Sequence, residues 1–450
     1  MIGANGKCHN GLRTRSQIWQ RPIEIAEYPP VVNASRPSVV ARSAIALEPA
    51  LQSERPTMSG AVSLVYHPLY DGRGFSPVTR SWGRYREARE LFSKLGIDRS
   101  ITTIEPPLAT IDELTLAHPL RFVERIRSLD AAGTGVFDTP DTVAWPGVFD
   151  RARAAVGATM EAVRLVTSGV SSHVFNPGGG LHHAFAERAR GFCIFNDLAI
   201  AVRALSQAGL ERVAIIDVDG HHGDGTQEIL YDHGALHISL HQYDGRFFPG
   251  TGSIDETGWG AGHGLKLNIP LPRHTGEEAY LDAFRSIVPT AIRAYSPQVI
   301  VLNFGVDGHH DDPLVKLRLG IRTYRFLAIA CHELAHEVAN GRMIVTGSGG
   351  YDPGVVSRCW SVLLATLTGQ LSRVHGLPPG SFLNAPSPDA TSKAILEAIG
   401  DTNAWNHPFG CLLDHHNPVP DPNAGAITAT TVHRIINGVL PLRLTKFRFT

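Results

Sequence analysis

The sequence predicts an α/β fold in which a mostly parallel sheet is sandwiched by helices. Two observations support this prediction. From Met58 to about Gln370, short apolar runs alternate with longer segments of helical periodicity. In addition, polar or glycine-rich segments follow four of the apolar runs. Because ligands of open α/β sheets bind beyond the carboxyl ends of the strands, the same pattern predicts an active site at that edge.

The predicted elements alternate along the chain in the way that is typical of βαβ units. Short runs rich in Val and Ile predict buried strands at Val62–Tyr66, His173–Phe175, Val213–Asp217, Leu236–Leu240, Val299–Phe304 and Met343–Thr346. Apolar residues at helical spacing predict helices at Tyr85–Leu95, Phe149–Thr167, Phe195–Gln207, Glu277–Tyr295, Ile321–Asn340 and Val355–Leu367.

Composition narrows the class of protein. The chain has 450 residues, is 43% hydrophobic and 18% charged, and has a formal net charge of −1, which suits one large α/β domain with extensions. The near-neutral charge gives no case for binding nucleic acid or an acidic membrane surface. No apolar run approaches transmembrane length, and no secretory signal is expected. The five scattered Cys residues favour a reducing, cytoplasmic location over disulfides.

Three regions are expected from changes in composition. Residues 1–57 mix Arg, Pro, Ser and Gln without periodicity, so we expect a disordered extension or a segment upstream of a start at Met58. Residues 58–370 form the predicted main domain. Residues 371–450 are richer in Pro and Asn and predict a C-terminal extension that packs on the domain or trails from it, with an edge strand as one reading of Val439–Phe449.

The strand predicted at Val213–Asp217 ends in a cluster of groups that can bind metal. Asp217, Asp219, His221, His222 and Asp224 lie within eight positions, which is unusual for a solvated loop. Alternation along an extended chain places Asp217, Asp219 and His221 on one side. Asp219 and His221 can therefore bind one ion together, with Asp217 behind them.

The other strand ends supply the remaining groups of an active site. A catalytic metal needs three protein ligands and an open position, and Asp307, which follows Val299–Phe304, is the natural third ligand. Two carboxylates and one imidazole favour Zn²⁺, with Fe²⁺ as an alternative. His182 and His183 follow a glycine triplet, and Tyr351 lies in a glycine-rich turn, so these side chains are candidate catalytic groups at the same edge of the sheet.

Five motifs resemble the signatures of the zinc-dependent histone deacetylase family. They occur in the family's order between about residue 60 and residue 370, at Gly178–His183, Gly191–Asp197, Asp217–Gly225, Phe247–Gly252 and Gly349–Tyr351. Bacterial members of this family include acetoin-utilization-type deacetylases and acetylpolyamine amidohydrolases. The resemblance implies the arginase/deacetylase fold and the metal ligands Asp219, His221 and Asp307. It also implies that His182 and His183 form a proton-transfer pair, in which Asp217 supports His182 and Asp224 supports His183, and that Tyr351 is the oxyanion donor.

The resemblance implies two further sets of residues. Phe192 and Phe248 match the aromatic walls of the family's substrate tunnel, Leu314 closes it, and Asp141 matches an acidic rim residue. A structural K⁺ is implied at a second position, bound by Asp217, by the main chain at Asp219 and His221, and by the backbone carbonyls of Ser239 and Leu240.

The sequence therefore predicts a zinc-dependent deacetylase that hydrolyses an N-acetyl amide, with acetyl-lysine in a protein as the expected substrate. The alternatives are an acetylated polyamine or other small amide as substrate, a non-catalytic acyl-lysine binder, and a dinuclear ureohydrolase, although His222 stands where the last would need a carboxylate. The segment His332–His336 also fits the metalloprotease pattern His-Glu-x-x-His. We expect it instead to be a surface face of an outer helix, remote from the strand ends. The oligomeric state is left open.

Overall fold

The computed structural model describes residues 61–72, 83–371, 414 and 421–439. Within these residues the chain forms a single sheet whose strands are all parallel, in the order β2-β1-β3-β8-β7-β4-β5-β6. The strands are β1 Val62–Val65, β2 Thr102–Ile104, β3 His173–Asn176, β4 Val213–Asp217, β5 Leu236–Gln242, β6 Lys266–Leu271, β7 Val299–Asn303 and β8 Met343–Thr346. This arrangement confirms the predicted fold class.

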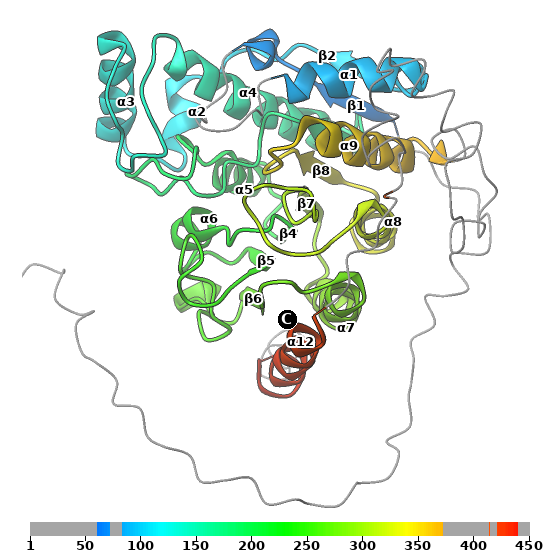
Figure 1. Cartoon of the computed structure of the whole chain (residues 1–450). Coiled ribbons are helices and arrows are strands. Elements are labelled where there is room, and N and C mark those ends of the chain that lie inside the picture. Colours follow the sequence, from blue (N-terminus) through cyan, green and yellow to red (C-terminus); the bar gives the residue numbers. More distant parts are fainter. Residues whose placement is uncertain (1–60, 73–82, 372–413, 415–420, 440–450) are drawn as a thin grey trace, which may run out of the picture. The chain divides into compact units, whose positions relative to one another are not determined.

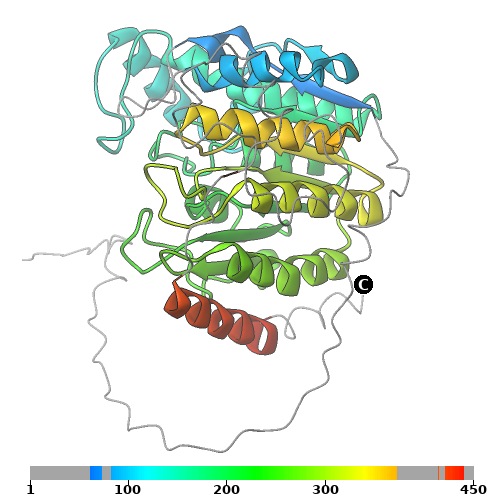
Figure 2. The ribbon, with the colours of Figure 1, turned by 45° about the vertical axis from the view of Figure 1, so that its right-hand side comes forward.

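Helices cover both faces of the sheet (Figure 1). On one face α1, α9, α8 and α7 pack side by side in that order, and α12 packs on α7 and β6 (Figure 2). On the other face α4 contacts β3 and α5 contacts β4. The helices are α1 Arg84–Lys94, α2 Ile111–Thr115, α3 Leu120–Ala132, α4 Val148–Thr167, α5 Asp197–Gln207, α6 Asp224–Ile229, α7 Glu277–Tyr295, α8 Ile321–Val338, α9 Pro353–Leu367 and α12 Pro422–Arg434.

The central strands are buried because helices cover them from both sides, as their continuous apolar runs require. Every residue of β4 and β7 is buried.

Capping side chains fix where two helices begin. The Asn196 side chain accepts a hydrogen bond from the Ala199 N–H at the start of α5. The Asp352 side chain accepts one from the Val355 N–H at the start of α9, where Pro353 is the first helical residue. These caps fix helices directly after the loops that carry the predicted site.

Strand register aligns a row of polar residues along the carboxyl edge of the sheet. Asn176 pairs with Thr346, Thr346 with Asn303, Asn303 with Asp217, and Asp217 with Ser239. Four of these residues end their strands, so the loops after β3, β8, β7 and β4 begin at the same level. Ser239 instead lies inside β5, which continues to Gln242. The predicted convergence of strand ends therefore has its structural basis in this register.

The structure also differs from the predictions. Strands β2 and β6 and the helices α2, α3, α6 and α12 were not anticipated. The expectation of a surface face at His332–His336 is wrong for His332, which is only 6% exposed, because α8 lies between α7 and α9 and turns this residue inward. Residues 1–57 lie outside the described part of the chain, as does the possible edge strand beyond Val439.

Candidate active site

Asp217 anchors the site at the end of β4. Its Oδ2 lies 2.8 Å from Nδ1 of His182, and its Oδ1 accepts hydrogen bonds from the Asn303 amide at 3.0 Å and from the Asp219 N–H at 3.1 Å. Asp217 is completely buried, so these bonds satisfy a carboxylate that would otherwise be costly to bury. Asp217 thereby links the predicted metal group to the histidine pair.

The predicted metal ligands Asp219, His221 and Asp307 converge. Their ligand atoms lie within 4.8 Å of one another. Nδ1 of His221 lies 2.7 Å from Oδ2 of Asp307 and 3.3 Å from Oδ1 of Asp219. All three side chains are buried, although they come from the ends of two different strands.

The electrostatics of this cluster suit a divalent cation. Burial and the neighbouring charge of Asp219 raise the pKa of Asp307 to about 6. Burial and the charge of Asp307 raise the pKa of Asp312 to about 8. Burial opposes charge on His221, but Asp307 outweighs it and raises the imidazole pKa to about 10. Carboxylates crowded in a buried space repel one another, and a bound dication relieves that repulsion.

Gly349 leaves room for this cluster. Its N–H donates to Oδ2 of Asp219 at 2.8 Å. A Cβ atom at this position would lie 2.5 Å from Oδ2 of Asp219 and 2.6 Å from Oδ2 of Asp307. Glycine at 349 therefore lets the backbone approach both carboxylates, and the donor set and the space around it fit a metal ion.

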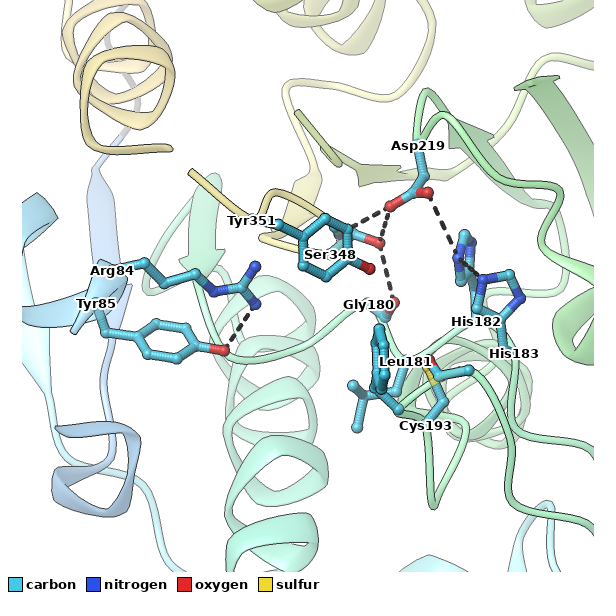
Figure 3. A pocket seen from close by; sticks show the side chains of 13 residues that line it. Arg84, Tyr85, Gly180, Leu181, His182, His183, Cys193, Asp219, Ser348 and Tyr351 are labelled. Carbon is cyan, nitrogen blue, oxygen red and sulfur yellow. Dashed lines mark hydrogen bonds and ion pairs between the residues drawn. The ribbon is translucent and has the colours of Figure 1, made fainter. Parts of the chain in front are cut away.

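His182 and His183 lie beside Asp219 of the cluster (Figure 3), and each has a further carboxylate partner, Asp217 for His182 and Asp224 for His183. Their Nε2 atoms are 3.1 Å apart, and Nδ1 of His183 is 2.7 Å from Oδ1 of Asp224. Burial would lower the pKa of His182, but Asp217 and Asp219 outweigh it and raise that pKa to about 9. Burial and the charge of His182 lower the pKa of His183 to about 4. The pair therefore holds one charged and one neutral imidazole.

Tyr351 lines the same pocket as the histidine pair. Its backbone N–H donates to Asp312 at 2.9 Å, and its ring lies edge-on to that of Phe192 with centroids 6.0 Å apart. Burial and the carboxylates of Asp307 and Asp219 raise the pKa of Tyr351 well above its usual value. The hydroxyl therefore stays protonated and can donate a hydrogen bond.

Of the predicted tunnel residues, two lie at the site. Phe192 lines the pocket, and Phe248 packs edge-on against His183 with ring centroids 4.9 Å apart. Leu314 is absent from the described residues that line this pocket. Oδ1 of Asp141 accepts a hydrogen bond from the Gly191 N–H at 3.2 Å, so this carboxylate holds the loop that carries Phe192. A rim role for Asp141 stays a prediction.

The residues expected to hold a monovalent cation lie behind the metal cluster. Asp217 and Ser239 are register partners in neighbouring strands, and Leu240 follows Ser239 in β5. Ser239 Oγ lies 2.9 Å from Nδ1 of His241. The side chains of Asp217 and Asp219 are already engaged by His182 and by Ser348. The cation itself stays a prediction.

Several residues of the site were missed by sequence reasoning. Asn303 donates to Asp217 and to Ser348 at 2.9 Å, and Ser348 donates to Oδ2 of Asp219 at 2.9 Å. Arg190 forms an ion pair with Asp224 at 3.1 Å and lies over the ring of Phe248. Arg84 reaches the pocket from α1 on the far side of Tyr351 (Figure 3). The sequence signal that could have identified Asn303 and Ser348 is a polar residue at, or just after, the end of a predicted strand.

The fold and the site together define a class of α/β hydrolases that carry a carboxylate–imidazole cluster at the carboxyl edge of a parallel sheet. The histone deacetylase domain matches residues 79–367. The chain therefore belongs to the histone deacetylase family, and it is a hydrolytic enzyme that acts on amides.

Relatives agree with this assignment. The chain is 37% identical to the acetoin utilization protein AcuC of Bacillus subtilis over 61% of its own length and 73% of that protein. It is 33% identical to the histone deacetylase-like amidohydrolase of Pseudomonas aeruginosa over 72% of its length and 84% of that protein. A crystal structure of the HDA15 HD domain is similar in fold, with a TM-score of 0.63 at 24% identity. The match covers 83% of this chain and 99% of that one.

Among the described residues, no helix combines the length and apolar character needed to span a membrane.

Proposed function

We propose that this enzyme removes the acetyl group from an N-acetylated amine, with the side chain of acetyl-lysine in a protein as the first candidate substrate. One observation carries the proposal. A buried carboxylate–imidazole cluster, a histidine pair with carboxylate partners and the hydroxyl-bearing ring of Tyr351 belong to one site. These are the groups that hydrolysis of an unactivated amide requires.

Asp219, His221 and Asp307 would hold a single divalent ion, for which Zn²⁺ is the first choice and Fe²⁺ the second. When bound, the ion supplies Lewis-acid polarisation of the amide carbonyl and makes water more acidic. The buried carboxylates around the ligands favour a cation here, and Gly349 keeps the space open. The structural K⁺ proposed at Asp217, Asp219, His221, Ser239 and Leu240 would support the same loop from behind.

The histidine pair would move the protons of the reaction. Its Nε2 atoms are 3.1 Å apart, so one imidazole donates and the other accepts. His183, which burial keeps neutral, would take a proton from the attacking water and give a proton to the leaving amine nitrogen as the C–N bond breaks. Asp217 and Asp224 orient the two rings through their Nδ1 atoms. The products are acetate and a free amine.

Tyr351 would donate its hydroxyl to the carbonyl oxygen as negative charge develops there. A neutral phenol in a buried site suits this role because the donor does not need to reorganise when the charge appears. Asp312 fixes the backbone of Tyr351, while the ring of Phe192 packs against it.

Two features favour a mono-metal deacetylase over the other candidates. His222 stands where a dinuclear ureohydrolase needs a further carboxylate, and its Nδ1 lies 2.9 Å from Thr251 Oγ1. A non-catalytic acyl-lysine binder would not need the complete histidine pair and Tyr351. A small acetylated amine remains the alternative substrate, because a relative's name associates that protein with acetoin utilization.

The test is acetate release from a panel of acetyl-lysine peptides and from acetylated polyamines, with Zn²⁺-loaded and Fe²⁺-loaded enzyme. The proposal expects release from at least one group, and the ratio of kcat/KM values between groups identifies the substrate class. Tyr351→Phe serves as the chemically minimal control because it removes only the proposed oxyanion donor. Metal-loaded enzyme that releases acetate from neither group would overturn the proposal.

A further inference from the structure

Three histidines meet at the amino end of the sheet, on the edge opposite to the active site. His173 opens β3, and His332 and His336 lie one turn apart on α8. Their Nε2 atoms form a triangle with sides of 3.0, 3.1 and 3.2 Å. We propose that this histidine triad (His173, His332 and His336) is a second metal site that binds Zn²⁺, independently of the proposed active-site metal.

Hydrogen bonding alone cannot satisfy the triad. Each Nε2 either carries a hydrogen and donates, or lacks one and accepts. Among three atoms with only two possible states, at least two share a state. At least one of the three contacts therefore places two donors or two lone pairs face to face at about 3 Å. A cation at the centre removes this conflict because all three nitrogens then present lone pairs to it.

The size of the triangle also favours a metal over water. Tetrahedral Zn–N bonds of about 2.0–2.1 Å place neighbouring ligand nitrogens roughly 3.3 Å apart. A tetrahedral water with N···O distances of about 2.9 Å would need nitrogens roughly 4.7 Å apart. The observed separations of 3.0–3.2 Å match the metal. The three rings are also nearly perpendicular to one another, with interplanar angles of 72°, 87° and 89°, which lets each nitrogen reach one centre without ring clashes.

The surroundings keep the imidazoles in the form that binds metal. Burial lowers the pKa of His173 to about 4 and that of His332 to about 3, and burial also lowers the pKa of His336. Neutral imidazole is the ligand form, so no proton must be displaced at neutral pH. His173 is completely buried, whereas His336 is partly exposed. The exposed side gives the ion an entry path and leaves a fourth position for water.

The site would tie elements that are far apart in the sequence. It joins the first residue of β3 to the last turns of α8, just before the turn that leads into β8. Gly341 in that turn lies against the His336 ring, since a Cβ there would be 3.1 Å from its Cε1 and the residue has a φ of +78°. A bound ion would therefore act as a structural tie between β3 and α8.

The experiment counts metal ions in the full chain after equilibration with Zn²⁺ and removal of the unbound ion. We expect two Zn²⁺ per chain in the native protein and one in His336→Gln, with deacetylase activity unchanged. His433→Gln, which alters an exposed histidine of α12, is the matched control and should retain both ions. Equal Zn²⁺ content in the native protein and His336→Gln would overturn the proposal.

A second measurement does not depend on altering the triad. The double variant Asp219→Asn/Asp307→Asn removes two active-site ligands and leaves the triad intact, so Co²⁺ bound to it should show the visible absorption of a four-coordinate ion. Zn²⁺ should raise the melting temperature of this variant, and adding His336→Gln should abolish both effects. A double variant without the Co²⁺ spectrum would refute the second site, whether or not acetate release is observed in the native enzyme.

Discussion

The two ends of the parallel sheet use the same residue type in opposite ways. At the carboxyl end, His182, His183 and His221 each contact a carboxylate, at distances of 2.7 or 2.8 Å. At the amino end, the imidazoles of the histidine triad contact one another through their Nε2 atoms. Strand β3 connects the two regions, since His173 begins it and Asn176 ends it in the polar row.

The difference shows that the partner, and not burial alone, sets the charge of a buried imidazole. Burial lowers the pKa of both His182 and His332, and both side chains are almost fully enclosed. Asp217 and Asp219 nevertheless raise the pKa of His182 to about 9, whereas the pKa of His332, which has histidine neighbours, falls to about 3. Neutral imidazole is the form that binds a metal ion, so histidine neighbours in place of carboxylates keep His332 in its ligand form.

The largest loss of activity is expected from a substitution in the metal cluster at the carboxyl end of the sheet, with the histidine triad left unchanged. Asp219→Asn replaces a charged predicted metal ligand by a neutral amide with one acceptor oxygen, whereas Asp219 uses Oδ2 for Ser348 and Gly349 and Oδ1 for the His221 N–H. We expect kcat/KM to fall by about 10³-fold or more, because metal polarisation is worth several kcal/mol of barrier. Acetate release measures this effect. Asp255→Asn, an exposed carboxylate, is the control, and near-normal activity in Asp219→Asn would show that this residue does not hold the essential ion.

A slightly smaller effect is expected when the oxyanion donor is removed. Tyr351→Phe should lower kcat by roughly 10²–10³-fold with little change in KM, as loss of one such donor does elsewhere. The fold should be unaffected because Asp312 is bound by the backbone N–H of residue 351. Steady-state kinetics on the best substrate, with Tyr231→Phe as control, provide the measurement. A change confined to KM would instead assign Tyr351 to ground-state binding.

Asp224→Asn tests whether the carboxylate partners set the function of the histidine pair. The neutral amide would hold the Nδ1–H of His183 less strongly than the carboxylate does, and it would leave Arg190 without its ion pair. We expect kcat to fall about 10–100-fold, as in metal sites when a group that orients a metal-bound imidazole is lost, while the histidine triad keeps its ion. Unchanged kcat across the pH range would show that His183 does not need this carboxylate.

Sequence reasoning anticipated that polar side chains meet at the carboxyl end because they directly follow strands along the chain. The run Val213–Asp217 and the polar residues after it form one continuous pattern, and parallel strands bring such ends together. Elements without this pattern were missed. Strand β2 has only three residues, and β6 carries the polar residues Lys266 and Asn268 that mask an apolar run. Their placement depends on pairing with neighbours, which local sequence does not express.

The amino end was misjudged for a related reason. His332 and His336 are one helical turn apart, which local spacing reveals, but their third partner, His173, lies 159 residues before His332. The register of β3 with β8 and β8 with β7, together with the packing of α8 on β7, brings the three together. A local pattern therefore identified the pair, but neither its burial nor its partner could be predicted from the pattern.

A buried histidine outside both histidine groups, His118, extends the comparison to protein stability. His118 is completely buried, and its two ring nitrogens have different partners: Nδ1 lies 3.0 Å from the Ala186 carbonyl, and Nε2 accepts from the Asn196 N–H at 2.8 Å. These contacts need the neutral ring, in contrast to the conflict within the histidine triad. Burial lowers its pKa from 6.5 to about 4.

This lowered pKa predicts a pH-dependent contribution to stability. The unfolded chain binds a proton at His118 more readily than the folded chain does, so the contribution is complete above pH 6.5 and is lost as the pH falls toward about 4. Between about pH 7.5 and about pH 5, the free energy of unfolding should fall about 2 kcal/mol more in the native protein than in His118→Gln. Urea unfolding followed by circular dichroism at the two pH values measures this difference.

The measurement compares how much the free energy of unfolding changes between the two pH values in each protein. The absolute free energies are not compared, because glutamine alters the two hydrogen bonds at every pH. His433→Gln replaces an exposed histidine of α12 and should follow the native pH dependence. If His118→Gln and the native protein lose stability in parallel between these pH values, His118 is protonated as easily in the folded chain as in the unfolded one. Burial and hydrogen-bonded ring nitrogens would then be insufficient to keep the His118 imidazole neutral. The contact of the three triad imidazoles with one another would then be the feature that distinguishes the triad from His118.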